Sequence, residues 1–176
     1  MTIKERIFNY LKRREPARKK TFPHYENIRS VLVLYESDYQ EKNTVIRDIR
    51  DTLLKQNMDV VTWGFLPNKK QIQSLILPQS RILSAADFHW WGTPKQEILT
   101  DLDRREYDLM IDLTQQNCVP LHYIALRARA SFKTGRVLPL TDGIYDFMIN
   151  MPDEDRSQAT LFNQIIHYLM IIHSND

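Results

Sequence analysis

Hydrophobic residues along this chain alternate between short, nearly continuous apolar runs and stretches in which they recur at helical spacing. The apolar runs are typical of strands that are buried on both faces of a parallel sheet. The strands predicted in this way are residues 30–35 (SVLVLY), 58–65 (MDVVTWGF), 107–113 (YDLMIDL), 131–134 (SFKT) and, at a sheet edge, 146–151 (DFMINM). Residues 81–91 fit either a further strand that starts at Ile82 or a loop.

The stretches between the strands carry apolar residues three and four positions apart, which indicates amphipathic helices. These helices are predicted to begin near Asn43, Gln71, Pro94, Pro120 and Asp155, and the last one continues to His173. Asparagine caps helices well, and proline suits a first helical turn. Strands that alternate with helices predict an α/β protein, a three-layer sandwich around a mainly parallel, Rossmann-like sheet of five or six strands.

The beginning of the chain has a pattern of its own. Ile3, Ile7 and Leu11 recur at helical spacing with Lys and Arg around them, which predicts an amphipathic helix. Pro16 should end this helix, because proline disfavours the helical conformation in the residue before it. We therefore divide the chain into an appended basic amphipathic helix with its linker, residues 1–27, and a single α/β domain, residues 28–176.

Length and composition fit this division. A chain of 176 residues is expected to form one domain. Its apolar runs are far shorter than the roughly 20 residues that a membrane-spanning helix needs. Cys118 is the single cysteine, so no internal disulfide can form, and no signal peptide is recognisable. We expect a cytoplasmic protein, with a peripheral position at the inner face of the membrane as a further possibility.

Charge is distributed unevenly. Residues 1–20 contain eight basic and two acidic residues, whereas the rest of the chain contains sixteen basic and twenty acidic ones. We predict that the basic segment docks on an anionic membrane surface or on a protein partner. The candidate docking residues are Lys12, Arg13, Arg14, Arg18, Lys19 and Lys20. Nucleic acid is not expected, because no nucleic-acid-binding motif is present. The competing interpretation is that the helix packs on the body or on a second copy of the chain, which would form a homo-oligomer.

Polar residues gather where the predicted strands end. Parallel sheets bind ligands at the carboxyl ends of their strands, so these residues form a candidate ligand edge. The candidates are Glu36, Asp38, Asp112, Thr114, Lys133 and Arg136. Asp108 shares a strand with Asp112, but it lies at the opposite end. The competing interpretation is that these side chains are loop ends and helix caps.

The sequence gives little support for a cofactor site, a metal site or a catalytic nucleophile. The chain has four glycines, and the sequence contains no GxGxxG or GxxxxGK[ST] motif. We therefore predict no dinucleotide or other cofactor. The histidines lack metal-ligand spacing, so we predict no metal. Cys118 and His122 are four residues apart, but no orienting acid accompanies them, and we interpret them as buried residues. The aromatic segment 88–92 (FHWWG) either fills the core or stacks on a ligand ring.

Several segments carry a resemblance to known families. They are SVLVLY (30–35), WWGTPK (90–95), IDL (111–113), PLHYI (120–124), FKTG (132–135) and IIHYLMII (165–172). Together with the basic start, they resemble a bacterial family of small α/β proteins of unknown function, over residues 28–172. This resemblance implies a common fold. The family carries no assigned activity, cofactor or catalytic residue, so no functional residue can be transferred from it.

A shorter stretch points elsewhere. YDLMIDL, PLHYIALRARA and SFKTGR together cover about 30 residues from 107 to 136. They resemble the last part of the N-terminal domain of heptosyltransferase-type glycosyltransferases. In that family a strand ending in Asp is followed by a helix and by a short basic strand that closes in glycine.

Two functional hypotheses follow from these patterns. The first is a non-catalytic module that docks on an anionic surface or a protein partner through its basic N-terminal segment. The alternative is a small-ligand-binding domain or enzyme, for a sugar phosphate or nucleotide, that uses the carboxyl ends of the strands. Whether that edge of the sheet is open or filled distinguishes the two.

Overall fold

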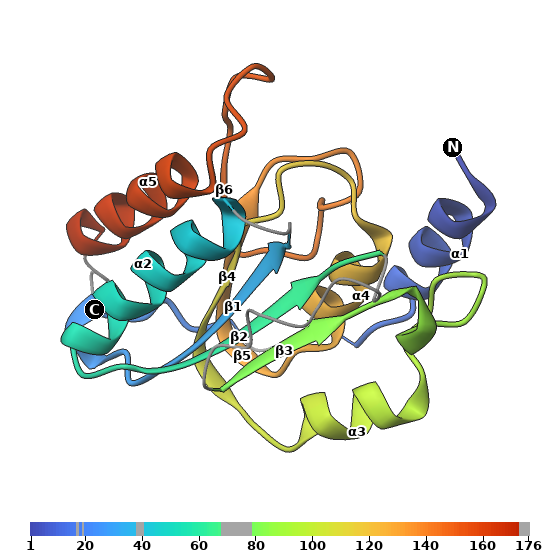
Figure 1. The fold of residues 1–176 in the computed structure, drawn as a ribbon, viewed down its shortest axis with the longest axis horizontal. Helices are drawn as coiled ribbons and strands as arrows, with labels where there is room; N and C mark the ends of the chain where they lie inside the picture. The colour runs from blue at the N-terminus through green and yellow to red at the C-terminus, as the bar shows by residue number, and fades with distance from the viewer. Residues whose placement is uncertain (17, 19, 38–40, 68–78, 173–176) are drawn as a thin grey trace.

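The structure is a computed structural model that describes residues 1–16, 18, 20–37, 41–67 and 79–172. These residues form a six-stranded sheet in the order β3-β2-β1-β4-β5-β6, and each strand pair is parallel (Figure 1). The strands are β1 (Ser30–Glu36), β2 (Asp59–Phe65), β3 (Ser80–Leu83), β4 (Tyr107–Asp112), β5 (Ala130–Arg136) and β6 (Phe147–Ile149). The predicted Rossmann-like α/β fold is confirmed.

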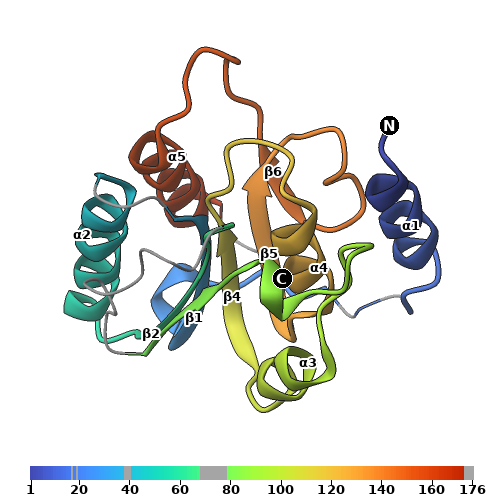
Figure 2. The same cartoon turned by 45° about the vertical axis from the view of Figure 1, so that its right-hand side comes forward.

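Helices cover both faces of the sheet (Figure 2). They are α1 (Ile3–Lys12), α2 (Glu41–Lys55), α3 (Gln96–Asp103), α4 (Val119–Arg127) and α5 (Gln158–Ile171). Helices α2 and α5 cover one face, whereas α3 and α4 cover the other, with α1 against α4. Residues of β1 alternate between the two cores, because successive side chains of a strand point to opposite faces. Val31 and Val33 face α2 and α5, and Leu32 and Leu34 face α4.

Several element boundaries differ from those predicted. Helix α2 begins two residues before Asn43, which is therefore not its cap, and Pro94 precedes α3, whose N-cap is Lys95. Strand β5 is longer than predicted, because it continues to Arg136 beside β6. The helix predicted to begin near Gln71 and the predicted end of α5 at His173 lie outside the described residues.

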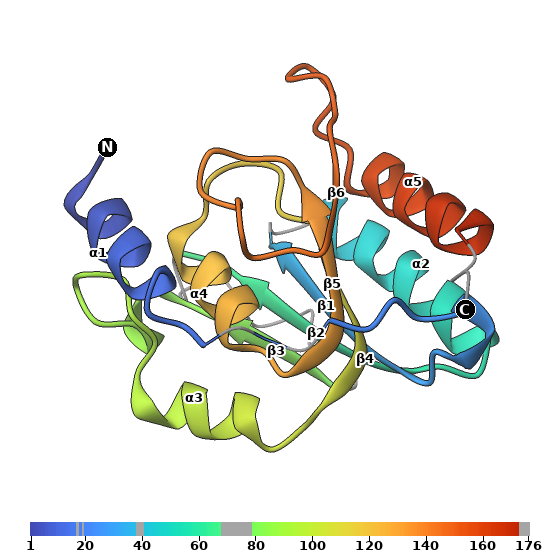
Figure 3. The same cartoon turned by 180° about the vertical axis from the view of Figure 1, so that it is seen from behind.

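The ambiguous stretch 81–91 contains both of the structures that the sequence allowed. Strand β3 ends at Leu83, a short 3-10 helix (Ala85–Asp87) follows, and residues 88–94 form a turn closed by a bridge between Phe88 and Pro94. Gly92 adopts a φ of 99° in this turn, a conformation that favours glycine. The turn lies beside α1 in both the front and the back views (Figures 1 and 3).

The most deeply buried contact of helix α1 with the body is the side chain of Phe8. Thr2 and Glu5 form a capping box at its start. Phe8 is fully buried and meets the ring of Tyr123 edge to face, with the ring centroids 4.8 Å apart. The interpretation that the helix packs on the body is therefore correct for the face of α1 that carries Phe8.

The linker after α1 covers the open edge of β5. The backbone N–H of Thr21 donates to the Ser131 carbonyl at 3.3 Å, and the Arg18 guanidinium donates to the carbonyls of Ala130 and Ser131. Residues 147–149 of β6 pair only with the second half of β5, so the linker occupies the place of a further strand segment. Among the described residues, no helix is long and apolar enough to cross a membrane.

Phe8→Ala should destabilise the protein by about 3–5 kcal/mol, because it removes a fully buried ring and leaves a cavity between α1 and α4. Ile3→Ala, in the same helix but at a 59% exposed position, should change the free energy of unfolding by less than about 0.5 kcal/mol. Urea unfolding measures both. Equal midpoints for the two variants would show that α1 is not docked in solution.

Candidate functional site

The strand order reverses between β1 and β4, and a Rossmann-like sheet binds its ligands in the crevice at such a point. Glu36 ends β1 and Asp112 ends β4, so both reach this carboxyl rim of the sheet. The rim also receives Thr114 and Arg136, whereas Asp38 lies outside the described residues. Four of the six predicted residues therefore meet there.

Asp112 is buried at the rim, with 1% of its surface exposed. Its carboxylate accepts hydrogen bonds from the backbone N–H of Thr114 at 2.9 Å, from the Thr114 hydroxyl and from the Tyr145 hydroxyl. Burial, and then the charge of Asp112, raise the pKa of Tyr145 well above its ordinary value, so its hydroxyl stays a donor. Thus the donors around Asp112 come from the chain itself.

Arg136 fills the same rim from β5. Its guanidinium donates to the Gln115 side-chain oxygen at 3.0 Å and to the backbone carbonyls of Met151, Pro152 and Asp155. Four acceptors satisfy a cation that has little contact with water, as burial of a charged group requires. Arg136 therefore fastens the segment after β6 across the carboxyl ends of the strands.

Glu36 belongs to the same network. Its carboxylate accepts the backbone N–H of Gln115 at 3.2 Å, and its carbonyl accepts the side-chain amide of Gln158 at 3.3 Å. Through Gln115, the ends of β1 and β5 are connected. The described part of the rim is thus bridged by side chains, an arrangement that stabilises the loops above the sheet.

Lys133 does not reach this rim. Its ammonium group donates to the carbonyls of Ala125 at 2.7 Å and Leu126 at 3.0 Å, at the C-terminal end of α4 and so toward the amino ends of the strands. Burial, and then the charge of Arg18, lower the pKa of Lys133 to about 7. Helix carbonyls at this end favour a cation, and Lys133 supplies one.

Asp108 lies at the amino end of β4, as the sequence predicted. Its carboxylate accepts the backbone N–H groups of Arg29 at 2.8 Å and Ser30 at 2.9 Å. Although burial raises the pKa of Asp108, these hydrogen bonds lower it below its ordinary value. Asp108 thus ties the beginning of β4 to the beginning of β1.

Cys118 and His122 form a local capping contact. The backbone N–H of Cys118 donates to Nε2 of His122 at 3.3 Å. Burial raises the pKa of the Cys118 thiol to about 12, and burial lowers the pKa of His122. A thiol that stays protonated at neutral pH is a poor nucleophile, so this pair does not form an activated dyad. Among the described residues, no group of three or more His, Cys, Asp or Glu side chains could hold a metal ion.

The predicted docking residues divide into two groups. Lys12 donates to the carbonyls of Leu140 at 3.1 Å and Asp142 at 2.8 Å, Arg18 is paired with Asp146, and Lys20 lies 3.6 Å from the same carboxylate. The side chains of these three residues are therefore directed to the body of the protein. Arg13 and Arg14 are exposed, and Lys19 lies outside the described residues.

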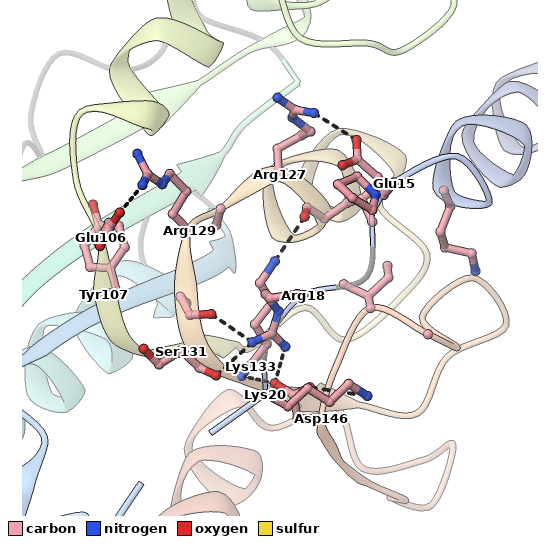
Figure 4. Close-up of a pocket in the computed structure, with 17 residues that line it drawn as sticks. Glu15, Arg18, Lys20, Glu106, Tyr107, Arg127, Arg129, Ser131, Lys133 and Asp146 are labelled. Carbon is pink, nitrogen blue, oxygen red and sulfur yellow. Dashed lines mark hydrogen bonds and ion pairs between the residues drawn. The ribbon is translucent and has the colours of Figure 1, made fainter. Parts of the chain in front are cut away.

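A cavity that the sequence analysis missed lies at the amino ends of β4 and β5 (Figure 4). Arg127 at the end of α4, Arg129 in the α4–β5 connection and Glu106 just before β4 contribute to its lining. The alternation of arginine and alanine at 127–130 was the available signal, because it places two arginines where a helix ends and a strand follows.

The comparisons with known proteins agree with this fold. The chain belongs to a family of unknown function, DUF6913, whose sequence profile matches residues 1–172. The resemblance to such a family is therefore confirmed. No protein of curated function matches the sequence significantly.

A solved structure is similar at low identity. It is the crystal structure of a glycosyl transferase family 9 protein from Veillonella parvula, with a TM-score of 0.54 and 10% identity. The match covers 90% of this chain but 45% of that one, so the chain spans less than half of that protein's length. The local resemblance to glycosyltransferases is confirmed as a similarity of fold.

Arg136→Met should destabilise the protein by roughly 3 kcal/mol, because it leaves buried carbonyls at the rim without their charged donor. Arg156→Met removes an exposed arginine from the segment after β6 that Arg136 contacts, and it should change stability by less than about 0.5 kcal/mol. Thermal unfolding of the two variants measures the difference. Similar losses would mean that Arg136 does not hold the rim.

The folded protein should react with iodoacetamide at pH 8 about a thousandfold more slowly than the unfolded chain, because the raised pKa of Cys118 lowers its thiolate fraction. Mass spectrometry measures alkylation against time, with guanidinium-unfolded protein as the control. Comparable rates would indicate an accessible, activated thiol.

Proposed function

We propose that this protein is a non-catalytic module that docks on the anionic surface of a lipid bilayer through the outer face of α1. The observation that carries this proposal is an apolar stripe on α1 that the body leaves uncovered and that arginines flank. The closed hydrogen-bond network at the carboxyl rim also supports it, because Asp112 and Arg136 direct their polar atoms to the chain itself.

The apolar residues of α1 occupy two sides of the helix. Phe8 and Leu11 pack on the body. Ile3, Ile7 and Tyr10 follow the spacing i, i+4 and i+7, which places them along one further stripe. Ile3 is 59% exposed and Tyr10 is 55% exposed, and Ile7 between them is half-buried. A stripe that is apolar and exposed is suited to contact with a second surface.

Cations flank this stripe. The side chains of Arg6 and Arg13 are exposed and have no hydrogen-bond or ion-pair partner within the part of the chain that the structure describes. The Arg14 guanidinium lies over the ring of Tyr10, 4.6 Å from its centroid. Apolar side chains bordered by Lys and Arg are the composition of helices that lie in the interface of an anionic membrane. Together with the exposed Trp90 in the neighbouring turn, this charge pattern favours lipid phosphates as the surface that the stripe contacts.

The aromatic turn at 88–94 lies beside α1. Trp90 is 70% exposed, whereas Phe88 is buried. A Cβ built on Gly92 would lie 3.8 Å from Cδ of Lys4, so the turn rests against α1 (Figure 3). Tryptophan favours the level of the lipid headgroups, where its ring is partly buried and its N–H is hydrated. Trp90 is therefore a suitable second anchor next to a short helix.

Vesicle flotation tests the proposal with the full chain. The protein should float with vesicles of phosphatidylcholine mixed with phosphatidylglycerol and remain at the bottom with phosphatidylcholine alone. The double variant Arg13→Gln, Arg14→Gln should lower the partition coefficient by roughly 30-fold, because each basic residue near an anionic leaflet contributes about 1 kcal/mol. Added salt should weaken binding in the same direction.

The matched control is the double variant Arg47→Gln, Arg156→Gln, which removes the same charge from exposed positions away from α1. It should float like the unchanged protein. An equal loss of vesicle binding in both double variants would show that binding depends only on net charge, and it would contradict docking through α1. Absence of flotation with anionic vesicles would overturn the lipid assignment and leave an acidic protein as the partner.

A further inference from the structure

The cavity at the amino ends of β4 and β5 goes beyond the proposed membrane contact. It has a volume of about 710 Å³. Its walls come from the linker after α1, the end of α4, the beginnings of β4 and β5, and residues 143–146 (Figure 4). This volume lies within the range of about 300–1,000 Å³ that is usual for small-molecule sites.

Basic side chains outnumber acidic ones in the described lining. The basic residues are Lys12, Arg18, Lys20, Arg127, Arg129 and Lys133, and the acidic ones are Glu15, Glu106 and Asp146. Each carboxylate is already paired with one arginine: Glu15 with Arg127 at 3.0 Å, Glu106 with Arg129, and Asp146 with Arg18. The cavity therefore carries an excess of positive charge that its own acids do not neutralise.

Two lysines account for much of this excess. Among the described residues, the ammonium groups of Lys12 and Lys133 have only backbone carbonyls as hydrogen-bond partners. Lys133 is 3% exposed, so a carboxylate or an anion would stabilise it more than carbonyl dipoles do. An anionic ligand would supply the missing negative charge.

Two of the arginines at the cavity can exchange their present partners for a ligand. The ion pairs of Arg127 and Arg129 are solvent-exposed, and exposed pairs contribute little to stability. Both guanidinium groups can therefore exchange a carboxylate for a ligand at small cost. Planar guanidinium groups bind phosphate through two parallel hydrogen bonds, and this geometry selects a phosphoryl group over a chloride ion.

The rest of the lining is apolar. Tyr107, Leu126, Ala128, Ala130 and Ile144 contribute to the same walls. Inorganic phosphate would occupy a small part of this volume, so the remainder is available to an organic group. We propose that the cavity binds a phosphomonoester, with its phosphoryl group held by Arg127, Arg129 and the neighbouring lysines and its organic part against the apolar wall.

The pKa of Lys133 adds a signature to this site. Charged groups face Lys133 from the linker after α1 (Arg18 and Glu15), from α4 (Arg127) and from the loop before β6 (Asp146). Its pKa of about 7 in the free protein should rise when a dianion binds, so binding takes up a proton near pH 7. A phosphomonoester stays dianionic above about pH 7, so affinity should fall as the pH rises from about 7 to 9.

Isothermal titration calorimetry with ribose 5-phosphate tests the site. The phosphorylated sugar should bind, free ribose should not, and inorganic phosphate should compete. Arg129→Gln should weaken binding at least tenfold. In the free protein it removes only an ion pair with Glu106, whose side chain is 68% exposed, and a 3.5 Å contact with the Asp103 carbonyl. Arg104→Gln is the matched control, because it removes an exposed, singly paired arginine at the end of α3, outside the cavity.

Two further measurements keep the result decisive. Lys133→Met should abolish the fall in affinity between about pH 7 and pH 9. A cooperative thermal unfolding transition shows whether the variant is folded. Short-chain phosphatidic acid carries the same phosphoryl group on a lipid: tighter binding than ribose 5-phosphate would identify a headgroup as the source, and weaker binding a soluble metabolite. No heat with any of these phosphates, or equal loss in Arg129→Gln and Arg104→Gln, would overturn the proposal.

Discussion

A parallel sheet buries both of its faces, and this constraint determines where every other element of the chain lies. The alternation of side chains along β1 sends Val31 and Val33 to one core and Leu32 and Leu34 to the other. Helices α2 and α5 must therefore cover one face, and α3 and α4 the other. Once the faces are covered, polar chemistry is confined to the two rims and to the outer surface of the helices.

The two rims differ in how their charges are satisfied. At the carboxyl rim, Asp112 and Arg136 receive their hydrogen-bond partners from the chain, so the charges stabilise loops above the sheet. At the amino rim, the ammonium groups of Lys12 and Lys133 donate hydrogen bonds only to backbone carbonyls within the described residues, and the surrounding arginines are partly exposed. The position that a Rossmann-like fold usually gives to a ligand is thus bridged here, while the opposite side carries unneutralised charge.

Helix α1 shows how one amphipathic segment can serve two contacts. Phe8 is buried against α4 and fixes the helix to the body, so Ile3 and Tyr10 are turned outward. The fold thereby determines which apolar residues remain for a partner. Attachment by Phe8 and presentation of the outer stripe are separable, because they depend on different sides of the helix. The membrane contact and the phosphomonoester cavity are likewise independent proposals, since they use different arginines.

The sequence by itself determined the fold class, because the alternation of apolar runs and helical spacing follows from local geometry. It also placed Asp112 and Asp108 at opposite ends of one strand. Only the tertiary structure decided that Arg136 turns inward to carbonyls beyond β6, that Lys133 reaches the end of α4, and that the apolar residues of α1 divide between two faces. Long side chains reach partners that are distant in sequence, as Arg18 reaches Asp146, and no local sequence pattern predicts which partner is reached.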